Sequence, residues 1–328
     1  MVVDVHGHIT HPELFKLLPM PPALADIGGM LEQKAKAGID VTIVGSPVGF
    51  GTMVPVEGMD NFDQPLDRLE SFHDWLAETV SDHAPHLSAY AYTNPFGDEA
   101  MLAQTAQTVR DGPFVGLIVN TSVRGEYLDS PGADAFFAMA EELDVPVFLH
   151  PPAEPVGTAS YAAFGLVEQV ARFCDVTACL ATLVFSGRLE RHPRLRLLAA
   201  MAGGAIGLLG ERLDTADRMR MRGGPPGSGP PGGGGPPPEA GASPPPSEQL
   251  RRIYVDTATS SRHALEADLD VLGAGRMMLG TDSPPASKPL EVSLQDVREL
   301  QLSEPERDAV LGATAADLFR LAPAVQPG

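Results

Sequence analysis

The sequence predicts a single α/β domain that folds as a (β/α)8 barrel of the TIM type. Three observations support this fold: eight short apolar runs occur along the 328 residues, stretches of helical length separate them, and no Gly-rich dinucleotide fingerprint is present. Strands that alternate with helices pair in parallel, and eight such units close into a barrel of roughly 250 residues or more. A doubly wound open sheet is the alternative, which the missing fingerprint weakens.

The candidate strands share one pattern, in which an apolar run ends in small or polar residues. They cover residues 2–8, 41–47, 87–95, 114–121, 145–152, 195–201, 253–258 and 276–282. Amphipathic patterns with the period of an α-helix predict helices over residues 26–37, 69–81, 99–110, 133–143 and 264–272. After the fifth strand the pattern predicts two helical stretches, at residues 161–174 and 177–191.

One segment departs from this alternation. Residues 223–247 contain nine Gly and ten Pro, with no aromatic or β-branched residue. Such a composition cannot bury enough apolar surface to offset the entropy lost on ordering, so we expect a disordered loop. Because the strand pattern continues on both sides, the segment is predicted to be an insertion between strands six and seven rather than a domain linker. Residues 1–328 then form one domain.

Charge and cysteine content narrow the class of partner. The chain has 43 acidic and 23 basic residues and a formal net charge of −20 at pH 7, which argues against nucleic acid and anionic membranes. The uncharged, Gly-rich stretch at residues 197–210 is too short to span the roughly 30 Å core of a bilayer. With two cysteines and no signal-peptide pattern, we expect a cytoplasmic protein that acts on a small-molecule substrate.

Four residues at predicted strand ends could hold a metal ion. His6 and His8 lie two apart on the first strand, so their side chains share one face about 6.5–7 Å apart. His150 ends the fifth strand and Asp282 the eighth. Three imidazoles and one carboxylate suit a divalent ion such as Zn²⁺, or Mn²⁺, unless these side chains only cap their strands. Asp256, ending strand seven, is expected to hydrogen-bond the site without binding metal.

Several motifs resemble the amidohydrolase superfamily, in the branch of aminocarboxymuconate semialdehyde decarboxylase and related carboxy-lyases and hydrolases. They are DVHGH at residues 4–8, FLHPP at 148–152, RRIYVDTA at 251–258 and LGTDSPP at 279–285. The resemblance spans nearly the whole chain except the Gly/Pro-rich insertion. It implies a barrel enzyme, a possible homodimer, with a single catalytic divalent metal, often zinc, held by His6, His8, His150 and Asp282.

Two departures from the family pattern concern the substrate side of the site. The family usually has a His at the end of strand six, where this chain has Met201, which cannot accept a proton at neutral pH. Either Asp282 acts alone as the base, a loop residue substitutes, or the chemistry is lost.

The loop after strand one lacks the Arg with which related decarboxylases hold their anionic substrate. Arg124 is then the best cation for a substrate carboxylate and Lys288 the next, while Phe50 contributes to an apolar mouth.

Taken with the resemblance, these features predict a metal-dependent nonoxidative decarboxylase of a small organic acid. Asp282 and His150 are expected to be catalytic, and Arg124, Phe50 and Met201 to contact the substrate. One alternative is a metal-dependent hydrolase acting on a C–N or C–C bond of a more apolar metabolite. Another is a pseudoenzyme or binding protein, because Met201 replaces the usual His.

Overall fold

The computed structural model describes residues 1–16, 20–46, 60, 62, 64–221, 244–259, 261–286 and 288–322. Within these residues, eight parallel strands form one sheet in chain order. They are β1 (Val3–His8), β2 (Val41–Gly45), β3 (Leu87–Tyr92), β4 (Phe114–Asn120), β7 (Val147–His150), β8 (Leu197–Ala199), β9 (Tyr254–Asp256) and β10 (Met277–Met278). Each lies within its predicted run, so all eight predicted strands are confirmed with shorter bounds.

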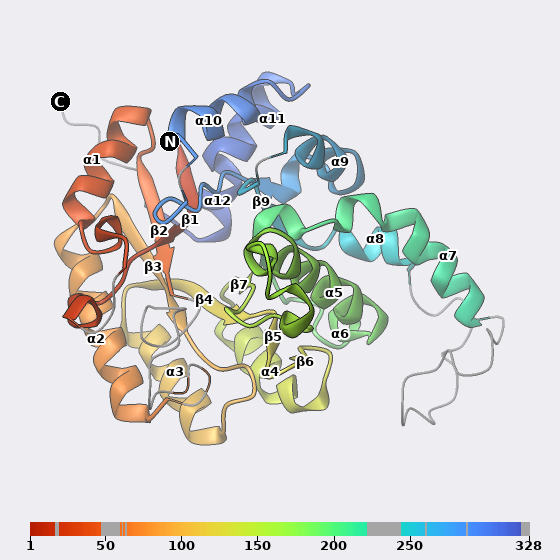
Figure 1. Cartoon of the computed structure of the whole chain (residues 1–328), viewed down its shortest axis with the longest axis horizontal. Coiled ribbons are helices and arrows are strands. Elements are labelled where there is room, and N and C mark those ends of the chain that lie inside the picture. Colours follow the sequence, from red (N-terminus) through yellow and green to blue (C-terminus); the bar gives the residue numbers. More distant parts are fainter. Residues whose placement is uncertain are drawn as a thin grey trace.

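The sheet closes into a barrel between its first and last strands. The Val5 N–H donates to Leu279 O at 2.9 Å, and the Asp282 N–H donates to His6 O at 2.8 Å. Both bonds join β1 to the segment after β10. Figure 1 shows the strands at the centre of the molecule with helices around them. The predicted (β/α)8 barrel is therefore confirmed.

Helices cover the outside of the barrel. They are α1 (Ile27–Ala37), α2 (Leu66–Asp82), α3 (Glu99–Asp111), α4 (Asp134–Leu143), α5 (Arg172–Phe185), α6 (Arg188–Arg191), α7 (Gly210–Met221), α8 (Pro246–Leu250), α9 (Arg262–Leu272), α10 (Leu290–Arg298), α11 (Glu304–Asp308) and α12 (Thr314–Leu318). Side-chain caps fix two of the predicted starts: Asp26 accepts from Gly29 N and Asp98 from Met101 N, both at 2.9 Å. Each cap satisfies a backbone donor that the first helical turn leaves unpaired.

The segment after β7 differs from its prediction. A π-helical turn, η5 (Val167–Ala171), runs directly into α5, so one helix crosses the predicted break at residues 175–176. Asp175 is a poor residue for an isolated helix interior. Here its buried carboxylate accepts from the hydroxyls of Thr121 and Ser122, at 2.5 and 3.0 Å. These tertiary bonds explain why the helix continues.

Apolar side chains fill the barrel itself as well as the layer between sheet and helices. Tyr90 and Phe148 stack inside the barrel with ring centroids 5.2 Å apart, and the Tyr90 hydroxyl donates to Val5 O at 2.9 Å. Leu198 and Met278 pack in the same cluster. The interior is thus a packed core rather than a pore, which leaves the C-terminal ends of the strands for a site.

Residues 222–243, which include most of the Gly/Pro-rich segment, lie outside the described residues. The chain leaves the described part after α7 and re-enters before α8, between the sixth barrel strand, β8, and the seventh, β9. Pro246 and Ser247, which the prediction assigned to the loop, begin α8, and the Ser247 hydroxyl donates to Asp214 at 2.7 Å. Among the helices described, not one has the length and apolar character needed to cross a bilayer.

Candidate metal centre

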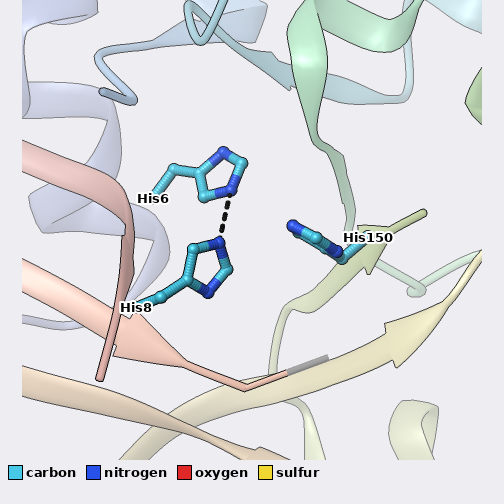
Figure 2. Close-up of side chains that lie close together, drawn as sticks. All are labelled: His6, His8 and His150. Atoms are coloured by element: carbon cyan, nitrogen blue, oxygen red, sulfur yellow. Dashed lines mark hydrogen bonds between the residues drawn. The ribbon is translucent and has the colours of Figure 1, made fainter. Parts of the chain in front are cut away.

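Three buried histidines converge at the C-terminal end of the barrel. His6 and His8 lie on β1, and His150 is the last residue of β7. One ring nitrogen from each lies within 4.8 Å of the others, and the Nε2 atoms of His6 and His8 are 3.1 Å apart. Figure 2 shows the three rings turned toward a common point. The spacing seen in the sequence therefore does bring these side chains together.

The second nitrogen of each ring meets a hydrogen-bond acceptor. His6 Nδ1 lies 2.5 Å from Asp256 Oδ2, His8 Nδ1 lies 3.0 Å from Gly45 O, and His150 Nδ1 lies 2.9 Å from Pro151 O. These acceptors place the ring proton on Nδ1, which leaves the Nε2 lone pairs for a cation. The predicted hydrogen bond between Asp256 and the site is confirmed, with Asp256 as the acceptor.

Asp282 completes the group. Its Oδ1 lies 3.4 Å from His6 Nε2 and 3.2 Å from His8 Nε2. Burial would raise the pKa of Asp282, but the neighbouring imidazoles of His6 and His8 lower it below the usual value. Burial and the neighbouring imidazoles lower the pKa of His150. An ionised carboxylate beside a neutral imidazole is the donor set that a divalent cation requires.

Met201 lies at the rim of the same site. It follows β8 and lines the cavity, with a left-handed φ of 56° that is uncommon for a residue with a side chain. Ala202 is also left-handed, with φ 54°, and its N–H donates to Asp256 Oδ1 at 2.9 Å. The backbone after β8 is therefore bent around Asp256, and Asp256 in turn contacts His6.

The structure does not bring Arg124, another predicted substrate residue, to this site. Arg124 pairs with Asp60, its side chain is 57% exposed, and it is not among the residues that line the cavity. Phe50 lies outside the described residues. Lys288 does line the cavity, where it donates to Asp296 Oδ2 at 2.5 Å and to Thr259 O at 2.7 Å.

A cavity of about 1200 Å³ opens beside His8, His150 and Asp282. Its described lining combines apolar and charged side chains, among them Ile9, Met20, Leu24, Glu154, Glu168, Arg172, Phe173, Met201 and Lys288. Sequence reasoning missed Arg172. Its spacing of four residues from Glu168 is typical of a solvent-exposed ion pair on a helix, so the pattern carried no signal of a cavity residue.

The family model for amidohydrolases matches residues 3–321. The chain belongs to the amidohydrolase family. Among curated proteins, 2-amino-3-carboxymuconate-6-semialdehyde decarboxylase from Dictyostelium discoideum is 22% identical over 288 residues, which cover 87% of this chain and 74% of the relative.

Solved structures share the barrel along almost the whole amidohydrolase chain. 5-Carboxyvanillate decarboxylase from Sphingomonas paucimobilis superimposes with a TM-score of 0.79 at 20% identity, covering 98% of this chain and 99% of that one. A dihydroxybenzoic acid decarboxylase from Polaromonas sp. JS666, solved with bound manganese and the inhibitor 2-nitroresorcinol, gives a TM-score of 0.77 at 18% identity, with 98% of each chain covered. These relatives are decarboxylases, and at least one of them holds a metal ion.

Proposed function

We propose that this amidohydrolase is a metal-dependent nonoxidative decarboxylase of a small organic acid. The observation that carries the proposal is the convergence of His6, His8 and His150 next to Asp282, beside a cavity lined by apolar and charged side chains. The names of the relatives support the same reaction class. The apolar side chains of Met20, Leu24, Phe173 and Met201 suit a flat, unsaturated or aromatic acid.

The four candidate ligands fit a borderline divalent ion, because imidazole nitrogens and a carboxylate are donors that zinc and manganese both accept. We propose zinc as the resident ion, with manganese as the alternative. Such an ion would supply positive charge to balance the negative charge that develops on the substrate when carbon dioxide leaves.

Elemental analysis should find close to one equivalent of metal per chain in the native protein and less than a tenth of an equivalent in His6→Ala and His150→Ala. Equal metal content in all three would contradict the site.

Asp282 is the candidate proton donor. Its carboxylate is ionised in the resting site, so it can take a proton from water or from a substrate hydroxyl. When the bond to the carboxylate breaks, the electron pair stays on the ring or chain carbon, and Asp282 delivers its proton there. Met201 has no proton to give, and Asp282 lies within 3.4 Å of both histidines of β1.

The direct test is carbon dioxide release from hydroxylated aromatic carboxylates, with 2,6-dihydroxybenzoate among the first. Asp282→Asn should lower kcat by about 100-fold or more, because general acid–base groups contribute about 10²–10⁴-fold. Thermal denaturation of the same variant checks that it folds. Turnover by hydrolysis of esters or amides without carbon dioxide release would favour the hydrolase, and the absence of any turnover would favour a binding protein.

Met201→His addresses the missing strand-six base. If Asp282 is sufficient as the proton donor, this variant should leave kcat unchanged. A large gain in kcat would instead place the proton donor at the end of β8.

Homodimerisation and a cytoplasmic location stay predictions of the sequence. Analytical sedimentation of the purified protein tests whether it is a homodimer.

A further inference from the structure

Arg172 contributes a positive charge to the wall of the cavity. Its side chain is only 12% exposed and lies among the cavity-lining residues. One guanidinium nitrogen is 3.4 Å from Pro151 O, the residue directly after His150, and another is 2.6 Å from Glu168 Oε2. The guanidinium is therefore close enough to the candidate metal centre to act on the same small molecule.

The fold holds this arginine in place. Asp175, one turn further along α5, accepts from Thr121 and Ser122 after β4 and from the backbone N–H of Val156 after β7, the last at 2.9 Å. These bonds tie the start of α5 to two strand ends of the barrel. Arg172 thus projects from a fixed helix rather than from a loop, which lowers the entropy lost when it binds a ligand.

One partner of Arg172, Glu168, can be exchanged for a ligand. Glu168 is one turn earlier on the same helical segment and its side chain is 60% exposed, so water can solvate its carboxylate when the ion pair opens. Lys288, the other cation in the lining, is held differently: Asp296 and Thr259 O both contact its ammonium group, and the lysine and aspartate side chains are each only 21% exposed. Of these two cations, Arg172 is the better suited to meet an anionic substrate group.

We propose that Arg172 is a specificity-determining residue that binds a second acidic group of the substrate, one that is retained in the product. This rests on the proposed decarboxylase function. The leaving carboxylate becomes neutral carbon dioxide, so an ion pair to it would stabilise the substrate more than the transition state. An ion pair to a retained carboxylate is equally strong before and after the bond breaks and serves to position the acid. The substrate class is then a dicarboxylic acid with an unsaturated or aromatic frame.

The test compares two probes that differ by one carboxylate, isophthalate and benzoate, by titration calorimetry on the zinc-loaded protein. The native protein should bind isophthalate about 10-fold to 100-fold more tightly than benzoate, the range expected for a charge-assisted hydrogen-bonded pair. Arg172→Met should remove this preference and leave benzoate affinity nearly unchanged, while Arg172→Lys should keep part of it. Arg110→Met is the matched control, because Arg110 also pairs with a glutamate, at 2.8 Å from Glu142, but is not among the cavity-lining residues.

Three results would overturn the proposal: no preference for isophthalate in the native protein, a preference that survives in a folded Arg172→Met variant, or an equal loss for both probes. The last would assign Arg172 to the carboxylate that the two probes share. Because binding is measured without turnover, failure here and failure of the decarboxylase proposal are separable. Loss of the isophthalate preference in Arg172→Met, in a protein that releases no carbon dioxide from any acid, would keep the ligand class and reject the reaction.

Discussion

Asp256 is the residue through which three parts of the candidate site are connected. Its Oδ2 faces His6 Nδ1 at 2.5 Å, and its Oδ1 accepts from the N–H groups of Ala202 and Ala258 at 2.9 and 3.1 Å. One carboxylate thus orients a candidate metal ligand on β1 and fixes the backbone that follows β8 and β9. An acceptor on the second ring nitrogen keeps an imidazole in the tautomer that can bind a metal.

We predict that Asp256→Asn lowers zinc affinity by about 10-fold to 100-fold, the usual effect of losing a partner of a ligating histidine. Competition with a chromophoric chelator measures the affinity directly. Asp268→Asn is the control, since it also changes a buried aspartate but touches none of the candidate ligands. Equal zinc affinity in the native protein and Asp256→Asn would show that His6 does not need this carboxylate.

At the scale of elements, helix α9 carries a buried carboxyl group, that of Asp268, which lies against the short helix η7 (Ile206–Leu208). Asp268 of α9 is 1% exposed, accepts from the Gly207 N–H, and its Oδ2 has no hydrogen-bond partner among the described residues. Burial, together with the charge of Asp256, raises the pKa of Asp268 to about 8. Asp268 is therefore largely protonated in the folded protein at neutral pH and ionised in the unfolded chain.

The raised pKa of Asp268 makes the free energy of unfolding depend on pH. Between the unfolded pKa near 4 and the folded pKa near 8, the folded state binds more protons, so stability falls as the pH rises, by up to about 1.36 kcal/mol per pH unit. Asp268→Asn cannot ionise. We predict that the free energy of unfolding of this variant, relative to the native protein, increases from pH 5 to pH 8. Urea denaturation at several pH values measures the difference, and a difference that does not change with pH would contradict the prediction.

How far each element could be predicted depends on whether its signal is local. The eight apolar runs and the alternation that turns His6 and His8 the same way are local, so the barrel and the histidine cluster followed from the sequence. The joined helix η5–α5 did not, because Asp175 is stabilised by residues more than fifty positions away. Arg172 was missed for the opposite reason: its local pairing with Glu168 is the pattern of an exposed helix face.

At the scale of the whole molecule, the barrel closes through a buried polar group. Lys34 of α1, 2% exposed, pairs with Asp4 of β1 and donates to the Thr281 hydroxyl at 2.7 Å. Asp4 also accepts from the Thr281 N–H at 2.9 Å and from the His6 N–H at 3.1 Å. The network joins the first strand, the first helix and the residue before Asp282, so it supports the closure and the candidate site together.

Lys34→Met leaves the Asp4 carboxylate buried without its counter-charge, and we predict a loss of about 3–5 kcal/mol in the free energy of unfolding. Changing Asp4→Asn in the same chain removes the stranded charge while keeping an oxygen that can accept from Thr281 and His6. The double variant should therefore recover at least half of the loss, as measured by urea denaturation with linear extrapolation. A double variant no more stable than Lys34→Met would mean that packing of the lysine stem, rather than charge pairing, holds the first and last strands together.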